Sequence, residues 1–234
     1  MVQRKGLFTG LVTAACALLL VSSAQADPTL DFAVAAPTAG TITYAGGAAP
    51  LIGTNIEVDN VIGIMTTLNP PPQPRLCFSC VLNFTTGNVQ STTSTVWTFA
   101  ANGTPGSITL VGEIDLDGDG VSNDGGAVTL FTGYFSDVTT VTTAGSTFKV
   151  AISSFSDIKD TALLNLYGLP TGVPYSGNFN ISFMATGLPP GALTSTTLLS
   201  GDITNVPTPE PGTLLLLGSG LAGFGYLARR RRRA

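Results

Sequence analysis

Hydrophobic and polar residues alternate over several short stretches in the middle of the chain. The pattern is clearest on residues 107–116, where one strand face would carry Ile108, Leu110, Ile114 and Leu116. The opposite face would carry Ser107, Thr109, Glu113 and Asp115. Similar alternation marks residues 41–44, 81–84, 96–99 and 178–183. A period of two is typical of strands with one buried face, and we predict about ten such strands.

Gly and Pro separate these stretches, and Thr is frequent throughout residues 27–205. This composition favours strands and turns over helices. The predicted fold class is therefore all-β, as a β-sandwich or jelly-roll domain. One helix is expected over residues 156–167, with Ser156 as its N-cap, Asp157 in its first turn, and Gly168 and Pro170 at its end.

The first 26 residues differ from this pattern. Arg4 and Lys5 precede an apolar run over residues 7–21, and small residues lead to Ala26. This order predicts a secretory signal peptide at 1–26, cleaved before Asp27, with the secretion translocon and signal peptidase as partners. A membrane anchor is the alternative, although the run is shorter than the ~18 residues that a span usually needs.

The last 29 residues, 206–234, contain three elements in order. Pro209, Glu210 and Pro211 come first, an uncharged apolar segment covers 212–228, and Arg229, Arg230, Arg231, Arg232 and Arg233 follow. As a helix, the apolar segment would be about 25 Å long, which suffices for a short transmembrane span. The arginines would stay on the cytoplasmic side and leave residues 27–205 outside.

This arrangement resembles the PEP-CTERM sorting signal of exported bacterial proteins. The resemblance implies recognition, and removal of the tail, by a membrane-embedded exosortase-like enzyme. It also implies a protein that is membrane-anchored before processing, then found at the cell surface or outside the cell, in association with exopolysaccharide. A plain stop-transfer anchor is the alternative. The resemblance covers the tail alone, so it assigns no function to residues 27–205.

Charge and composition exclude several functions for this central region. Only 10% of the chain is charged and it has no His. The central region has three bases, Arg75, Lys149 and Lys159, against thirteen acids. Nucleic-acid binding needs a basic surface, so we expect none. Without His, the Ser and Cys triads and the common zinc sites are also excluded.

Cys77 and Cys80 lie in a Cys-Phe-Ser-Cys unit after a proline-rich stretch at 69–74. In an exported protein these two cysteines are expected to form a disulfide. A thioredoxin-like redox site has the same spacing, but it needs a helix after the motif, and the residues that follow favour a strand.

An acidic stretch begins at Asp115 and reads Asp-Leu-Asp-Gly-Asp-Gly. Carboxylates at alternate positions followed by Gly resemble the first half of a calcium loop. The proposed ligands are the carboxylates of Asp115, Asp117, Asp119 and Asp124 and the carbonyl of Val121. Position twelve is Gly126 rather than Glu, so a plain solvated hairpin loop is the alternative.

Three functions from different classes remain. The leading prediction is a non-enzymatic surface or extracellular-matrix protein. A carbohydrate-binding module is the second, with Trp97 and Tyr44 as the aromatic candidates for sugar stacking. A secreted hydrolase is the third, for which Asp157 with Asp160 on a helix, or Glu57 with Asp59 on a strand, would supply the paired acids.

Overall fold

The computed structural model describes residues 27–36, 38–208, 218, 220 and 221. The expected signal peptide lies outside these residues, as do the Pro209–Pro211 motif, the arginines and most of the apolar segment at 212–228. Within the described part of the chain, no helix has the length and apolar character needed to cross a membrane.

The predicted all-β class is confirmed. The described residues form one short helix, α2 (Thr161–Leu166), and eleven strands: β1 (Thr29–Val34), β2 (Thr41–Tyr44), β3 (Pro50–Ile64), β4 (Arg75–Thr92), β5 (Val96–Phe99), β6 (Ile108–Ile114), β7 (Val128–Phe135), β8 (Thr139–Ala144), β9 (Thr147–Lys159), β10 (Tyr175–Thr186) and β11 (Leu193–Pro207). Residues 41–44, 81–84, 96–99 and 178–183 lie wholly on strands, and the stretch at 107–116 is a strand over Ile108–Ile114. The strands belong to one antiparallel sheet rather than to two separate ones.

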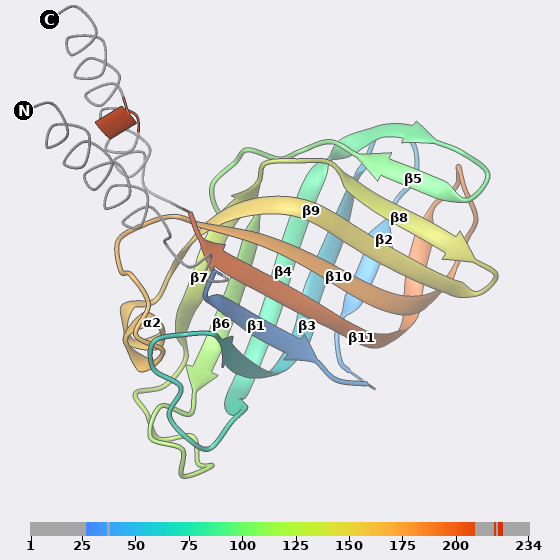
Figure 1. The fold of residues 1–234 in the computed structure, drawn as a ribbon. Coiled ribbons are helices and arrows are strands. Elements are labelled where there is room, and N and C mark those ends of the chain that lie inside the picture. The colour runs from blue at the N-terminus through green and yellow to red at the C-terminus, as the bar shows by residue number, and fades with distance from the viewer. Residues whose placement is uncertain (1–26, 37, 209–217, 219, 222–234) are drawn as a thin grey trace, which may run out of the picture.

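The sheet closes on itself (Figure 1). Starting from β3, the pairings run through β4, β6, β7, β9, β10, β11 and β1 and return to β3. Farther along the long strands, β5 and β8 take the places of β6 and β7, and β2 takes the place of β1. Within residues 27–208 as described, closure leaves no long unpaired edge, the feature through which open sheets associate.

One end of this closed sheet carries most of the chemically distinctive residues. Three connections meet there: residues 65–74 between β3 and β4, 115–127 between β6 and β7, and 160–174, which include α2. We call it the α2 end (Figure 1). The register also places Thr29 of β1 and Pro207 of β11 at this end. The first strand of the described domain therefore begins, and its last strand ends, at the α2 end.

Aromatic side chains fill the interior. Near the α2 end, Phe131 packs edge-on against Phe32 and stacks with Phe155. Toward the other end, Trp97 and Phe148 are in contact, and Phe148 stacks on Phe183. Large rings in contact with one another account for much of the apolar area that the fold buries.

The predicted helix at 156–167 is wrong in its first part. Residues up to Lys159 continue β9, and α2 begins only at Thr161. Asp160, not Ser156, is the N-cap: its carboxylate accepts hydrogen bonds from the backbone N–H groups of Ala162 (2.9 Å) and Leu163 (3.1 Å). The alternation of Phe155, Asp157 and Lys159 on one buried face explains why the strand continues.

Candidate functional site

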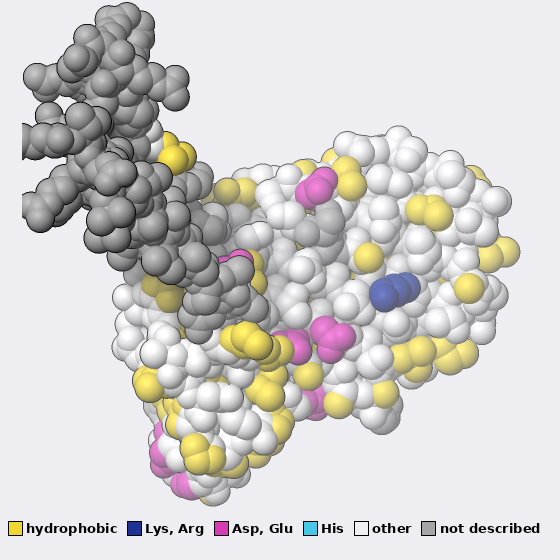
Figure 2. Space-filling model, viewed as in Figure 1, with side chains coloured by type: hydrophobic (Ala, Val, Ile, Leu, Met, Phe, Trp, Pro, Cys, Tyr) yellow, Lys and Arg dark blue, Asp and Glu magenta, His cyan; other side chains and the backbone are white. Residues whose placement is uncertain are grey.

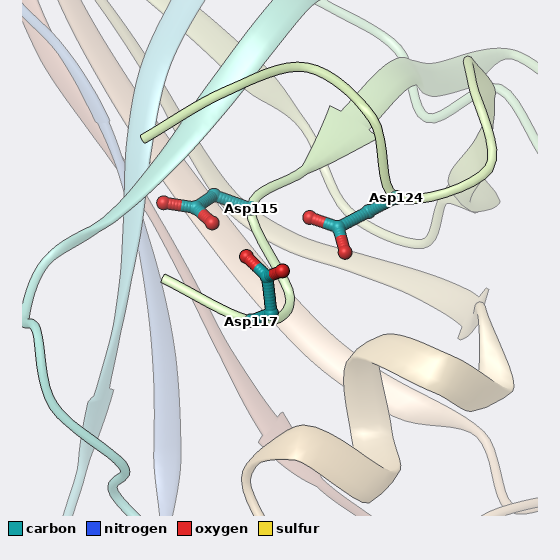
Figure 3. Close-up of side chains that lie close together, drawn as sticks. All are labelled: Asp115, Asp117 and Asp124. Carbon is teal, nitrogen blue, oxygen red and sulfur yellow. The ribbon is translucent and has the colours of Figure 1, made fainter. Parts of the chain in front are cut away.

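The acidic loop at 115–127 is the most chemically distinctive feature of the α2 end. It brings together the carboxylates of Asp115, Asp117 and Asp124, and one oxygen atom of each lies within 4.8 Å of the other two. Figure 3 shows the carboxylate of Asp117 between those of Asp115 and Asp124. Asp115 is buried, Asp124 is half-buried and Asp117 is exposed. Three carboxylates at this spacing offer the oxygen ligands that Ca²⁺ prefers.

Backbone hydrogen bonds hold all three of these carboxylates in place. Asp115 accepts from the N–H groups of Gly118 (2.7 Å) and Gly120 (3.2 Å), Asp117 accepts from the N–H of Asp119 (3.0 Å), and Asp124 accepts from the N–H of Leu116 (2.8 Å). The bonds of Asp115 tie the start of the loop to its middle, and the bond of Asp124 ties the later part of the loop to its start.

The fourth predicted carboxylate, that of Asp119, is placed differently. The carboxylate of Asp119 accepts hydrogen bonds from the backbone N–H of Val121 (2.7 Å) and from the side chain of Asn123 (3.2 Å). It does not belong to the group of three. The structure therefore brings together three of the four predicted carboxylates, and a cation there would have to draw further ligands from the backbone or from water.

Glu113, near the end of β6, holds the loop through hydrogen bonds. Its carboxylate accepts hydrogen bonds from the hydroxyl of Ser122 and from the backbone N–H of Gly126 (3.1 Å). These bonds favour the ionised form and lower the pKa of Glu113. The alternation predicted a solvated face for Glu113 and Asp115, whereas both are buried, 6% and 1% exposed, because the loop folds back over them.

A buried arginine lies under the same loop. The Arg75 side chain is 2% exposed, and one of its nitrogens donates to the carbonyl of Pro71 at 3.2 Å. A Cβ added to Gly118 would lie 2.0 Å from Arg75 Nη1, so the absence of a side chain there lets the loop rest on the guanidinium. The φ of Gly118 is +83°, which also favours Gly. This positive charge offsets part of the acidity of the loop.

A small cavity of about 130 Å³ separates the loop from α2. Glu113, Asp124 and Asp160 contribute to its lining together with apolar residues. The cavity is smaller than the pockets of ~300 Å³ or more that take organic ligands, so its size suits an ion and its water molecules better.

Cys77 and Cys80 are joined by a disulfide, the pairing that the sequence predicts. Both lie at the start of β4 and are largely buried. No helix follows them, since β4 continues to Thr92. This setting lacks the helix N-terminus that activates thiols in thioredoxin-like sites.

The first pair of acids considered for hydrolysis is not arranged as predicted. Asp157 lies on β9 and contacts Lys159, while Asp160 caps α2, so the two do not share a helix face as predicted. On β3, Glu57 is exposed and Asp59 accepts a hydrogen bond from the backbone N–H of Ala35 at 2.7 Å.

The aromatic candidates for sugar stacking are both in the core. Trp97 is 0% exposed and Tyr44 is 2% exposed, and each packs against other rings. Few charged side chains are visible on the face of the molecule in Figure 2. Among residues 27–36 and 38–208, Lys149 is the one exposed base, because Arg75 and Lys159 are buried.

The sequence analysis did not predict that three polar residues, Asp157, Lys159 and Asn205, are buried. They meet inside the sheet near the α2 end. Reading residues 155–159 as a strand would have placed Asp157 and Lys159 on the core face, an unusual position for a charged pair. Because we predicted a helix over residues 156–167, this charged pair on a core face was not recognised.

The chain continues from β11 directly into its tail, and β11 ends at Pro207. A family model described as the PEP-CTERM protein-sorting motif matches residues 207–233. The chain carries a PEP-CTERM sorting signal. Comparison with curated proteins and with solved structures gave no match.

The PEP-CTERM signal implies an exported, cell-surface protein that is processed by exosortase. The match begins at the last residue of β11, so the sorting signal follows the folded domain without a linker. The domain itself has no family match, and its role must be argued from its own residues.

Proposed function

We propose that this protein is a non-enzymatic component of the cell surface or extracellular matrix, delivered there through its PEP-CTERM signal and associated with exopolysaccharide. The sorting motif at 207–233 is the observation that carries the proposal. Residues 27–205 are the part that acts outside the cell, and the tail serves to hold the chain in the inner membrane until exosortase cuts it.

The described domain supports a structural role. Its sheet is closed, its interior is packed with aromatic rings, and a disulfide joins Cys77 to Cys80. The acids considered for hydrolysis serve other contacts: Asp157 pairs with Lys159, and Asp160 caps α2. A low surface charge and a closed sheet suit a protein that must persist outside the cell without associating through strand edges.

Replacement of Pro209, Glu210 and Pro211 by Ala tests the sorting step. Export should continue, because residues 1–26 are unchanged, but the unprocessed chain should accumulate in the inner membrane. A matched control replaces three exposed residues of the β4–β5 turn, 93–95, by Ala and should be processed normally. Normal release of the Pro209–Pro211 variant would show that the motif does not direct processing.

Association with the matrix needs a separate test. Cells are fractionated into membrane, surface and exopolysaccharide fractions, and the released protein is also mixed with purified exopolysaccharide from the same cells. We expect the protein to co-sediment with the polysaccharide and to leave its chain length unchanged. Shortening of the polysaccharide would instead support a hydrolase, and recovery only as free secreted protein would contradict matrix association.

A further inference from the structure

Lys159, Asp157 and Asn205 form a polar cluster inside an otherwise apolar interior. Lys159 and Asp157 are two residues apart on β9 and so point to the same side of the strand. The Lys159 Nζ atom contacts Asp157 Oδ2 directly, and Asn205 Nδ2 donates to the same oxygen at 3.4 Å. The Lys159 amine and the Asn205 side-chain amide therefore both contact one carboxylate oxygen of Asp157.

A glycine allows Asn205 to reach this carboxylate. Asn205 lies on β11 and Asp157 on β9, with β10 between them. Gly177 of β10 is the register partner of Asn205. A Cβ at Gly177 would lie 2.1 Å from Asn205 Nδ2 and 2.2 Å from the Phe155 ring. The missing side chain leaves the space through which the Asn205 amide crosses β10.

Aromatic rings surround the amine and keep water away. Lys159 Nζ lies 4.7 Å from the ring centre of Phe131, 5.2 Å from that of Tyr175 and 5.7 Å from that of Phe32. Burial lowers the pKa of Lys159 and raises the pKa of Asp157, which favours a neutral amine beside a protonated acid. A neutral amine is the nucleophilic form of lysine.

If Lys159 and Asp157 formed an ordinary ion pair, some buried polar atoms of this cluster would lack hydrogen-bond partners. Among the described residues, the Oδ1 atoms of Asp157 and of Asn205 are buried and have no hydrogen-bond partner. Buried charges are costly unless their remaining atoms are hydrogen-bonded. A reaction that removes the charge of Lys159 would remove much of this cost.

We propose that Lys159 and Asn205 become joined by an intramolecular amide bond, with Asp157 transferring the proton. The Nζ electron pair attacks Cγ of Asn205, and a new Nζ–Cγ bond forms. The protonated Asp157 delivers its proton to Nδ2 of Asn205 and takes one from the attacking amine in its place. The Cγ–Nδ2 bond then breaks and ammonia leaves. The step needs no oxidant, reductant or further reactant, and Asp157 ends as it began.

The bond would link β9 to β11 near the start of the sorting motif. Asn205 is two residues before Pro207, where that motif begins. A pull on the C-terminal end enters the domain through β11, which pairs with β1 and β10 through non-covalent contacts. A covalent link to β9 would keep β11 in place under such a load.

Trypsin digestion of the full-length protein, purified, denatured, reduced and alkylated, tests this proposal. An acylated Lys159 is not a cleavage site, so residues 150–229 should stay in one peptide, closed into a loop between residues 159 and 205, that is lighter than its sequence mass by one ammonia. Fragmentation of that peptide should locate the cross-link at Lys159 and Asn205. Cleavage after Lys149, which is exposed, is the internal control.

Two variants complete the experiment. Asn205→Leu removes the amide that the Lys159 amine would attack. Asp157→Asn removes the proton carrier and leaves that amine and amide in place. Digestion of either variant should release the peptide 150–159. Trypsin cleaves slowly between a lysine and an aspartate, and the variant digests show how completely it cleaves between Lys159 and Asp160 when no cross-link is present. The wild-type result does not depend on whether the variants fold. Release of 150–159 at its sequence mass from the wild-type protein would overturn the proposal, as would a loss of water, which would place the bond on Asp157.

Discussion

Calcium binding to the acidic loop should raise the thermal stability of the protein. One carboxylate oxygen of each of Asp115, Asp117 and Asp124 lies within 4.8 Å of the other two. At that separation two unit charges repel by roughly 3.5 kcal/mol for an effective dielectric constant of about 20, and by less where water screens an exposed group. A divalent cation among them would replace this repulsion with attraction.

The size of the effect follows from the affinity class of the site. Extracellular calcium modules commonly have dissociation constants of about 10⁻⁴ to 10⁻³ M. At a hundredfold excess of calcium over that constant, binding to the folded state alone adds roughly 2.7 kcal/mol to the free energy of unfolding. For a domain of this size, 1 kcal/mol shifts the melting temperature by about 2–4 °C, so the expected rise is roughly 5–11 °C.

The assay is a pair of thermal melts on the purified exported protein, one with excess calcium and one with chelator. Asp117→Asn should abolish most of the shift, and because Asp117 is exposed the substitution should leave the fold intact. Glu57→Gln is the matched control, since it removes one exposed acid on β3, and it should keep the full shift. Equal melting temperatures for the wild-type pair would refute the metal site, and a shift that survives Asp117→Asn would place it elsewhere.

Three further predictions concern the core, the disulfide and the acid response. Trp97→Ala should lower the free energy of unfolding by about 3–5 kcal/mol in denaturant titration, whereas Tyr134→Ala, at an exposed position, should change it by about 0.5 kcal/mol or less. Alkylation of the native protein without reductant should label neither Cys77 nor Cys80, and rapid labelling of both would contradict the disulfide. The pKa of Glu113 is lowered on folding from its ordinary value of 4.5, so its stabilising contribution is present above that pH and is lost as pH falls through the lower folded pKa. The stability difference between wild type and Glu113→Gln should therefore shrink in acid, and a constant difference would contradict the hydrogen bonds to this carboxylate.

The strands were predictable because their signal is local. Alternation marks the core-facing positions of residues 41–44, 96–99 and 178–183, and each range lies on a strand. Closure of the sheet was not predictable in the same way. It depends on pairings between distant segments, such as β1 with β11 and β4 with β6, and no short-range pattern specifies them.

The helix boundary shows how two local signals compete. Residues 156–167 contain a cap-like Ser156 and an acid in the first turn, which together favour a helix. Tertiary burial of Phe155, Asp157 and Lys159 keeps this segment in β9, and Asp160 supplies the cap four residues later. The candidate calcium ligands were found because their spacing is short. The cluster of Lys159, Asp157 and Asn205 was missed because 46 residues separate Lys159 from Asn205 and β10 lies between their strands.

The mature C-terminus of the wild-type protein tests the central claim most directly. Protein recovered from the surface or matrix fraction is digested, and mass spectrometry identifies its last residue. The account predicts a chain that retains β11 and lacks the arginines at 229–233, because exosortase has removed the tail. Protein that still ends at Ala234 would contradict it and would leave residues 206–234 as an uncleaved anchor.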